Sequence, residues 1–295
     1  VQYSGTNGGM VIYIADDPNT YYGMVEQDSR HYAQLAVAPM LTPCSPQEAL
    51  DFTRRAFDLS EQIGRPVMIL MTTPLANTSE LVTLGKIQSI KRNPSFDFNI
   101  ARYAKAGPVA CVQQHRDTLA SLDEFNKLAD DLNPLTLTES RTGIIAAGIT
   151  WNYLYDVIQS NNLKPSTLKL GVANPLPKEK IKTLLSNVDA VVVLEELEPL
   201  VENTVLALLS EIDHPVEVIG KVHGPLSQTG DYNMDVVASA LHEVIPNQVK
   251  QPVTSDNLTE QAQALKVKRL NTFCSACPHR AAYYSLNQAI EKLGY

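Results

Sequence analysis

The sequence has few cysteines, a deficit of basic charge and no long apolar run. Four cysteines among 295 residues do not make a disulfide framework, and two of them form a Cys-x-x-Cys pair that suggests metal or redox chemistry in a reducing compartment. The net charge of −8 argues against nucleic acid and against an anionic membrane surface as partners. No apolar stretch approaches a membrane span and no signal peptide is visible, so we expect a cytoplasmic protein.

What is present fits a soluble globular protein. Hydrophobic residues make up 44% and charged residues 19% of the chain, and its length allows two domains with generous cores. The chain begins at Val1 almost inside an expected strand and ends at Tyr295 after one expected helix. We therefore expect it to be an internal portion of a larger protein.

The first 30 residues carry the strongest local signal. A glycine-rich turn leads into residues 10–15, whose short apolar run predicts a buried strand. Asp16-Asp17-Pro18 ends this strand. Ligands bind beyond the carboxyl ends of strands in α/β sheets, so we predict a functional loop at residues 16–30.

A βαβ unit follows. Ser45 is the expected N-cap of a helix, with Pro46 at its first position and Glu48 completing a capping box. A single apolar stripe runs along this helix: Ala49, Phe52, Ala56, Leu59 and Ile63. Gly64 ends the helix and a buried strand is expected at residues 67–71, which predicts a parallel sheet.

Residues beyond 140 alternate regularly between strand and helix patterns. Strands are expected at 143–149, 168–173, 190–194 and 216–219, and helices at 151–160, 178–185, from Pro199 onwards and at 234–244. This alternation predicts a parallel, doubly wound sheet. The intervening segment is less regular, with one helix expected at 119–132.

Two stretches resemble one known family. Residues 5–18 (GTNGGMVIYIADDP) and 26–33 (EQDSRHYA) are similar to the pyrimidine-binding domain of the indolepyruvate ferredoxin oxidoreductase α subunit. That family belongs to the thiamine diphosphate-dependent 2-oxoacid:ferredoxin oxidoreductases. A second match is CSACPHR at 274–280, and the order and distance of the two matches fit the family, so the resemblance spans nearly the whole chain.

The resemblance implies an α/β fold with several parts. They are the C-terminal part of a pyrimidine-binding domain (1–75), a connector (76–140), a transketolase C-terminal-like domain with a doubly wound parallel sheet (141–245), a linker (246–270) and the start of a diphosphate-binding domain (271–295).

It also implies an activity for the complete enzyme. That enzyme would oxidatively decarboxylate indolepyruvate, or another arylpyruvate, to an acyl-CoA and pass electrons through [4Fe–4S] clusters to ferredoxin. Its cofactors would be thiamine diphosphate and Mg²⁺, its co-substrate coenzyme A, and its partner a β subunit. The activating Glu is expected before residue 1 and the magnesium-binding Gly-Asp-Gly motif after residue 295. The chain alone is therefore expected to be inactive and to bind none of these groups tightly.

The loop at 16–30 supplies the substrate-binding candidates: Tyr22, Met24, Glu26, Gln27 and Arg30. Relatives that act on pyruvate or 2-oxoglutarate often place a basic residue near the position of Met24. A methionine flanked by tyrosines suits an aryl substrate better than a small anion. Arg30 is expected to pair with one of the neighbouring acids. The alternative is an ordinary surface loop with solvated charges.

The cofactor-binding candidates lie in both matching stretches: Asn7, Gly8, His279 and Arg280. His279 and Arg280 stand just before an expected helix at 281–293, and a helix N-terminus with an added Arg attracts anions. The functional interpretation is contact with a cofactor or a 2-oxoacid carboxylate. The alternative is a surface Arg beside a capping His.

Cys274 and Cys277 are the metal-ligand candidates, for an iron–sulfur cluster. Two thiolates at this spacing grip one metal or one corner of a cluster, but a complete site needs about four ligands. The spacing of Cys44 and Cys111 does not match, and Ala276 stands where the family usually has Gly. The alternative is a pair of inert, buried cysteines at a helix entrance.

Several further polar residues are expected to be structural. Gly230-Asp231 begins like a magnesium-binding motif but continues with a tyrosine, so Asp231 or Asn233 is expected to cap the helix at 234–244. Glu195 and Glu196 are expected to be acids at a helix start. Structural or surface roles are expected for His115, His214, His223 and His242.

Two other functions remain open from the sequence. One is a relative that acts on a different 2-oxoacid. The other, from a different class, is a non-catalytic assembly subunit that uses the doubly wound scaffold only for docking, and fold analogy does not separate these.

Overall fold

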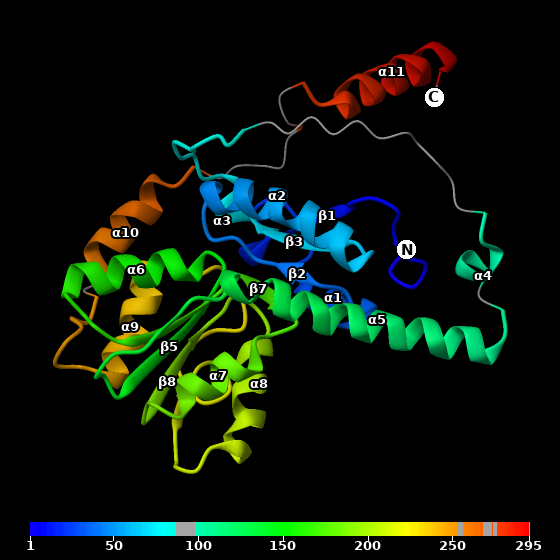
Figure 1. The fold of residues 1–295 in the computed structure, drawn as a ribbon. Coiled ribbons are helices and arrows are strands. Elements are labelled where there is room, and N and C mark those ends of the chain that lie inside the picture. The colour runs from blue at the N-terminus through cyan, green and yellow to red at the C-terminus, as the bar shows by residue number, and fades with distance from the viewer. Residues whose placement is uncertain (87–97, 105, 253–255, 268–272, 274–275, 295) are drawn as a thin grey trace. The chain divides into compact units, whose positions relative to one another are not determined.

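The structure is a computed structural model, which describes all residues except 87–97, 105, 253–255, 268–272, 274–275 and 295. The chain divides into two compact units, residues 1–252 and residues 253–295. The first unit contains two sheets of mainly parallel strands with helices packed on them (Figure 1). The second contains the helices α10 (Asp256–Leu265) and α11 (Pro278–Leu293).

The first sheet confirms the predicted βαβ unit. Its order is β1 (Val11–Asp16), β3 (Val67–Thr72), β2 (Met40–Leu41) and β7 (Val172–Asn174), and only β7 runs antiparallel to its neighbour. The predicted helix is α2 (Pro46–Ile63). The Ser45 side chain accepts a hydrogen bond from the backbone N–H of Glu48, and Gly64 ends the helix at a φ of +62°.

Helices cover both faces of this sheet. α2 and α5 (Pro108–Leu128) pack on one face, where Phe125 and Ala129 are fully buried against Phe52 and Leu41. α1 (Arg30–Ala36) covers the other face through Ala33. The helix expected at 119–132 therefore begins eleven residues earlier, at Pro108, and its C-terminal part belongs to the core of the first sheet. Shorter helical turns complete this half: η1 (Pro18–Thr20), α3 (Thr73–Ala76), α4 (Ile100–Tyr103) and η2 (Asp130–Leu132).

The second sheet has the order β4 (Leu135–Thr136), β6 (Ser166–Leu170), β5 (Thr142–Ala147), β8 (Ala190–Leu194) and β9 (Glu217–Ile219). All pairs are parallel except the edge pair of β4 with β6. Alternate residues of each strand face opposite helix layers. The layers are α6 (Thr150–Asn161) with α9 (Met234–Val244), and α7 (Lys178–Leu185) with α8 (Leu200–Leu208), which η3 (Leu209–Glu211) extends. The predicted doubly wound α/β fold is confirmed.

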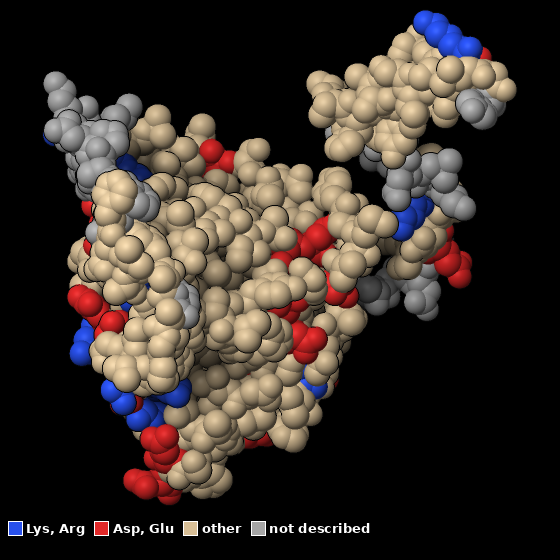
Figure 2. Space-filling view, turned by 90° about the vertical axis from the view of Figure 1, so that its right-hand side faces the viewer, with Lys and Arg blue, Asp and Glu red and all other residues tan. Residues whose placement is uncertain are grey.

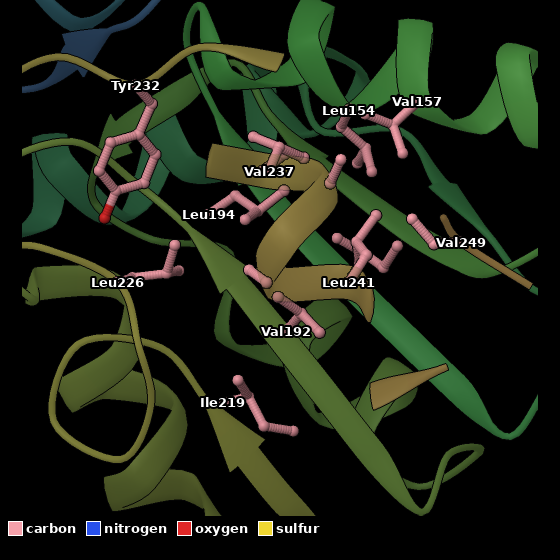
Figure 3. Packing of buried hydrophobic residues seen from close by; sticks show 14 of the residues in the cluster. Leu154, Val157, Val192, Leu194, Ile219, Leu226, Tyr232, Val237, Leu241 and Val249 are labelled. Carbon is pink, nitrogen blue, oxygen red and sulfur yellow. The ribbon is translucent and has the colours of Figure 1, made fainter. Parts of the chain in front are cut away.

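Figure 3 shows the core beneath the first of these layers. Val237 and Leu241 of α9 and Leu154 of α6 pack on Val192 and Leu194 of β8. These five side chains are at most 1% exposed. Each buried side chain of this size contributes roughly 1.5–3 kcal/mol, so this core holds α9, and the segment before it, firmly on the sheet.

The chain crosses from the second sheet to the first at Gly171. The sequence predicts one strand at 168–173, and this is wrong, because β6 ends at Leu170 and Val172 begins β7 of the other sheet. The buried amide oxygen of Asn133 accepts hydrogen bonds from the backbone N–H groups of Gly171 and Val172, both at 3.1 Å. A Cβ at position 171 would lie 2.3 Å from the carbonyl oxygen of Leu132. The crossing therefore requires a glycine.

The surface agrees with the composition. On the face shown in Figure 2, most side chains are uncharged, and acidic and basic groups occur in small separate groups. Among the described residues, none of the helices combines the length and the apolar character needed to cross a bilayer. α10 lies inside the span 246–270, for which a polar linker is predicted, and α11 begins three residues before the expected helix start.

Gly171→Ala should destabilise the fold by about 3 kcal/mol, because the new Cβ displaces the Leu132 backbone or the Phe52 ring in a close-packed site. Gly64→Ala is the matched control: open space surrounds it, and only its left-handed backbone opposes a side chain, at about 1 kcal/mol. Urea unfolding of both variants measures the difference. Equal losses would contradict the steric account of the crossing.

Candidate functional site

The loop at residues 16–30 leaves the carboxyl end of β1 and is held by hydrogen bonds to the Asp17 side chain. The Asp17 carboxylate accepts the backbone N–H groups of Tyr22, at 2.5 Å, and Gly23, and also the Thr73 hydroxyl at 2.6 Å. Slight burial opposes ionisation, but these hydrogen bonds lower the pKa of Asp17 below its ordinary value. Asn19 adopts a left-handed backbone, with a φ of +69°. The loop therefore has a defined, hydrogen-bonded conformation.

The tip of the loop presents apolar side chains to solvent. Tyr22 is 79% exposed and Met24 is 99% exposed, and Tyr21 and Val25 beside them are more than half exposed. Single exposed apolar residues are ordinary, whereas a cluster at a strand end indicates a contact surface. Of the predicted substrate-binding residues, Tyr22 and Met24 lie on this surface, and the side chain of Gln27 is exposed nearby.

The tip is joined to the segment before α9, and we call this junction the tip contact. Glu26 Oε1 accepts the backbone N–H groups of Asn19, at 2.6 Å, and of Gly230, at 2.7 Å. The Asn19 amide donates to Asp231 Oδ1 at 3.1 Å, and the Tyr21 hydroxyl donates to Asp231 Oδ2 at 3.2 Å. Glu26 therefore orients the loop instead of facing solvent.

The base of the loop is fixed by Arg30, which is 6% exposed. Its guanidinium makes an ion pair with Asp28 at 2.6 Å, which confirms the predicted pairing with a neighbouring acid, and a second ion pair with Glu195 at 2.6 Å. Nη2 also donates to the carbonyl oxygens of Glu196, at 2.9 Å, and Glu198, at 2.7 Å. Burial opposes the charge, but Glu195 and Asp28 raise the pKa of Arg30 above its ordinary value. Its role in substrate binding stays a prediction.

Glu195 links Arg30 to the second sheet. Its carboxylate accepts the backbone N–H groups of Val201, at 3.0 Å, and Glu202, at 2.9 Å, in the first turn of α8. The predicted acid at a helix start is confirmed, and the helix dipole favours this negative charge. One carboxylate thus joins a helix of the second sheet to the loop of the first.

Two further carboxyl groups line a small cleft between the sheets. Burial is the largest influence on Glu196 and raises its pKa to about 7. The hydrogen bond from the Tyr232 N–H, the second-largest influence, opposes this rise, and repulsion from Asp231 adds to it. Burial also raises the pKa of Asp16, although Ser29 donates two hydrogen bonds to it. The cleft has about 40 Å³ of free volume, room for a few water molecules but not for an aryl 2-oxoacid.

The segment after β9 holds charges that carry no recognisable signal in the sequence. Lys221 Nζ donates to the Leu197 carbonyl oxygen at 2.5 Å and lies 5.0 Å from the centre of the Tyr232 ring, and burial lowers the pKa of Lys221 to about 8. The fully buried Glu202 accepts the backbone N–H groups of Lys221 and Val222. In the sequence, Glu202 stands next to the apolar stripe of its helix, which is the usual pattern of a solvent-exposed acidic residue. Only the fold reveals that Glu202 points at a loop.

Two of the cofactor-binding candidates, Asn7 and Gly8, lie away from the loop. Asn7 and Gly8 precede β1, so a strand of about 20 Å separates them from residues 16–30, and the Asn7 side chain accepts a hydrogen bond from Arg102. In the second unit, His279 and Arg280 are exposed in the first turn of α11. The cofactor-binding roles of Asn7, Gly8, His279 and Arg280 stay predictions.

The cysteine pair falls partly outside the described residues, because Cys274 is not among them. Cys277 Sγ lies 3.3 Å from His279 Nδ1, just before α11. Searching the described residues finds no cluster of three or more His, Cys, Asp or Glu side chains suited to a metal. The iron–sulfur assignment of Cys274 and Cys277 stays a prediction.

Of the two candidate caps, Asn233 is the one used: its side chain accepts the Val236 N–H at 3.0 Å. Asp231 joins the tip contact instead. Structural roles are confirmed for His115, which stacks on Tyr3, and for His214 and His242, which bond to backbone carbonyl oxygens.

Comparison with known proteins gives consistent matches along the whole chain. Subunit IorA of indolepyruvate oxidoreductase from Methanothermobacter thermautotrophicus is 34% identical over 298 residues, which cover 99% of this chain and 46% of that protein. The same subunit from Archaeoglobus fulgidus is 30% identical over 303 residues, again covering 99% and 46%. The chain thus spans about half the length of these curated relatives. No family model matches it.

Two solved structures share parts of the fold at 13% identity. One is a 2-oxoglutarate:ferredoxin oxidoreductase from Magnetococcus marinus, with a TM-score of 0.48 over 70% of this chain and 42% of that one. The other is a split-gene transketolase, with a TM-score of 0.47 over 81% and 67%. These similarities are too distant to carry an argument about the site.

Glu196→Gln should remove a pH-dependent loss of stability. Because the folded-state pKa of Glu196 is raised from 4.5 to about 7, the folded protein holds this proton more tightly than the unfolded chain. Rising pH therefore lowers the free energy of unfolding through this window, on the order of 1–3 kcal/mol between about pH 5 and pH 8. The glutamine variant should lack this component. Parallel profiles of unfolding free energy against pH for the two proteins would show that Glu196 is not desolvated.

Proposed function

This chain is homologous over its whole length to subunit IorA of indolepyruvate oxidoreductases, and we propose that it forms about half of such a subunit in a 2-oxoacid:ferredoxin oxidoreductase. The 99% coverage of the chain by these relatives is the observation that carries the proposal. The substrate would be indolepyruvate or a related arylpyruvate. We further propose that the complete enzyme works in the cytoplasm with a β subunit and ferredoxin.

The proposed overall reaction is an oxidative decarboxylation. The 2-oxoacid loses CO₂, its acyl group is joined to coenzyme A, and two electrons pass through [4Fe–4S] clusters to ferredoxin. Thiamine diphosphate with Mg²⁺ would supply the carbanion chemistry of the complete enzyme. No step of that chemistry is assigned to the residues of this chain.

The contribution proposed for this chain is substrate selection by the loop at 16–30. Its tip offers Tyr22 and Met24 to solvent on a hydrogen-bonded base, and a neutral apolar tip favours an aryl group over a small anion. The buried Arg30 is fully engaged by protein groups, so its proposed part is to hold the loop. The predicted contact of Glu26 with substrate is likewise indirect, through the tip contact.

A docking function is the second candidate. The same exposed tip suits a protein partner, because exposed apolar clusters also mark subunit contacts. Reconstitution separates the two functions. A substrate-selecting loop alters substrate preference in the assembled enzyme, whereas a docking loop alters assembly.

Met24→Arg in the complete enzyme should shift preference away from aryl substrates, because the new charge would lose water when an aryl ring packs where the apolar Met24 side chain now lies. The ratio of kcat/KM for indolepyruvate over pyruvate should fall roughly tenfold or more. Leu35→Arg is the matched control, since Leu35 is 82% exposed on α1, outside the loop. It should leave the ratio unchanged.

Unaltered ratios in Met24→Arg would exclude this loop as the selector. Loss of assembly on size-exclusion chromatography, with normal ratios in whatever complex remains, would favour the docking function.

A further inference from the structure

We propose that Asp231 is a positioning residue for substrate selection: it holds the Tyr21 hydroxyl so that the Tyr21 ring is oriented toward an incoming aryl group. This inference rests on the proposed function of the loop. It makes the selectivity of a loop of the first sheet depend on a carboxylate that the second sheet supplies.

The contacts of Asp231 converge on one point of the loop. The Tyr21 hydroxyl donates to Asp231 Oδ2 at 3.2 Å, with Oδ1 at 3.4 Å. The Asn19 amide donates to Asp231 Oδ1 at 3.1 Å and to the Tyr21 hydroxyl oxygen at 3.0 Å. These three polar groups form a closed triangle. A charged acceptor makes such hydrogen bonds roughly twice as strong as a neutral one does.

The two sides of this junction differ in how firmly they are anchored. Asp231 is followed by Tyr232, which is 2% exposed, packs in the core of the second sheet and donates its hydroxyl to the Ser227 carbonyl oxygen at 2.9 Å. Figure 3 shows this tyrosine beside Leu194 and Leu226. Asn233 then caps α9. Tyr21 has no comparable support, being 55% exposed. Asp231 is therefore the fixed partner, and Tyr21 is the one positioned.

The neighbouring Glu26 acts on the same junction. It ties the Gly230 N–H, one residue from Asp231, to the Asn19 N–H of the loop through a single carboxylate oxygen. Asn19 is thus held by its backbone and by its side chain, and both attachments lead to the pair Gly230-Asp231. The loop tip cannot move away from Gly230 and Asp231 without breaking these hydrogen bonds.

The hydrogen bonds of the Tyr21 side chain leave its ring available to a ligand. Only the hydroxyl of Tyr21 is used, so its ring remains exposed beside Tyr22 and Met24. Fixing a ring in advance reduces the side-chain entropy lost when a ligand binds. The benefit falls on ground-state binding of the aryl group, so the loss of Asp231 should raise KM and leave kcat nearly unchanged.

The test uses the complete enzyme with four variants: Asp231→Ala, Asp231→Asn, Tyr21→Phe and the double variant of Asp231→Ala with Tyr21→Phe. Asp231→Ala should raise KM for indolepyruvate roughly three- to tenfold, the value of a lost hydrogen bond, with kcat within about twofold. Asp231→Asn should be close to wild type, because its amide oxygen still accepts the hydroxyl. The double variant should be no worse than the worse single variant, since both remove the same contact.

Asp235→Ala is the control, because Asp235 is an exposed carboxylate in the first turn of α9, four residues further along the chain. It should match wild type. KM for pyruvate should change little in every variant, because a small 2-oxoacid gains little from an oriented ring. An unchanged KM for indolepyruvate in Asp231→Ala, or additive effects in the double variant, would overturn the proposal.

A second readout separates this inference from the proposed function. Hydrogen exchange of the peptide covering residues 18–27 in the complete enzyme should be faster in Asp231→Ala than in wild type, and not in Asp231→Asn. If wild type shows no preference for indolepyruvate, the proposed function of the loop fails, and the exchange result still decides whether Asp231 positions it. Unchanged exchange in Asp231→Ala refutes the positioning role whatever the substrate.

Discussion

The buried guanidinium of Arg30 is the interaction on which the arrangement of this site depends. Arg30 begins α1 of the first sheet, and its partner Glu195 follows β8 of the second. With Asp28 on its other side, it joins the base of the loop at 16–30 to the first turn of α8. Such a buried cluster contributes little net stability, because desolvation offsets the attraction. Its main effect is specificity, since other packings of the two sheets would leave these charges unpaired.

The charged groups around Arg30 explain why the pKa of Glu196 is raised. Five carboxyl groups and two basic groups gather here: Asp16, Asp28, Glu195, Glu196, Glu202, Arg30 and Lys221. Acidic groups outnumber basic groups here, and burial removes the water that would stabilise their charges. Both effects favour protonation of the carboxyl group that has the weakest hydrogen-bond and ion-pair partners. That group is Glu196, whose pKa rises to about 7, while Arg30 and Glu195 remain paired. The tip contact adds Asp231 nearby, so the loop and the charge cluster are electrostatically coupled.

The sequence was sufficient for features set by local patterns. The capping box at Ser45, the strand at β1 and the alternation behind the doubly wound sheet all follow from neighbouring residues. It did not reveal the crossing at Gly171, because an apolar run has the same pattern whether it forms one strand, as predicted for residues 168–173, or parts of two strands, as observed. Nor did it show that Glu202 and Lys221 are buried or that Asp231 reaches the loop, because these contacts join residues far apart in sequence. The loop itself was predicted from its place after a strand, whereas its supports came from the other sheet.

The most direct test of this account is the effect of Arg30→Met on both stability and the loop. Leaving Asp28 and Glu195 buried without their partner should lower the free energy of unfolding by about 3–5 kcal/mol. It should also speed hydrogen exchange of the peptide covering residues 18–27. Arg141→Met, which removes an exposed ion pair with Asp189, should change neither appreciably. If Arg30→Met were as stable as that control and its loop exchanged at the wild-type rate, Arg30 would not be what holds the loop against the second sheet.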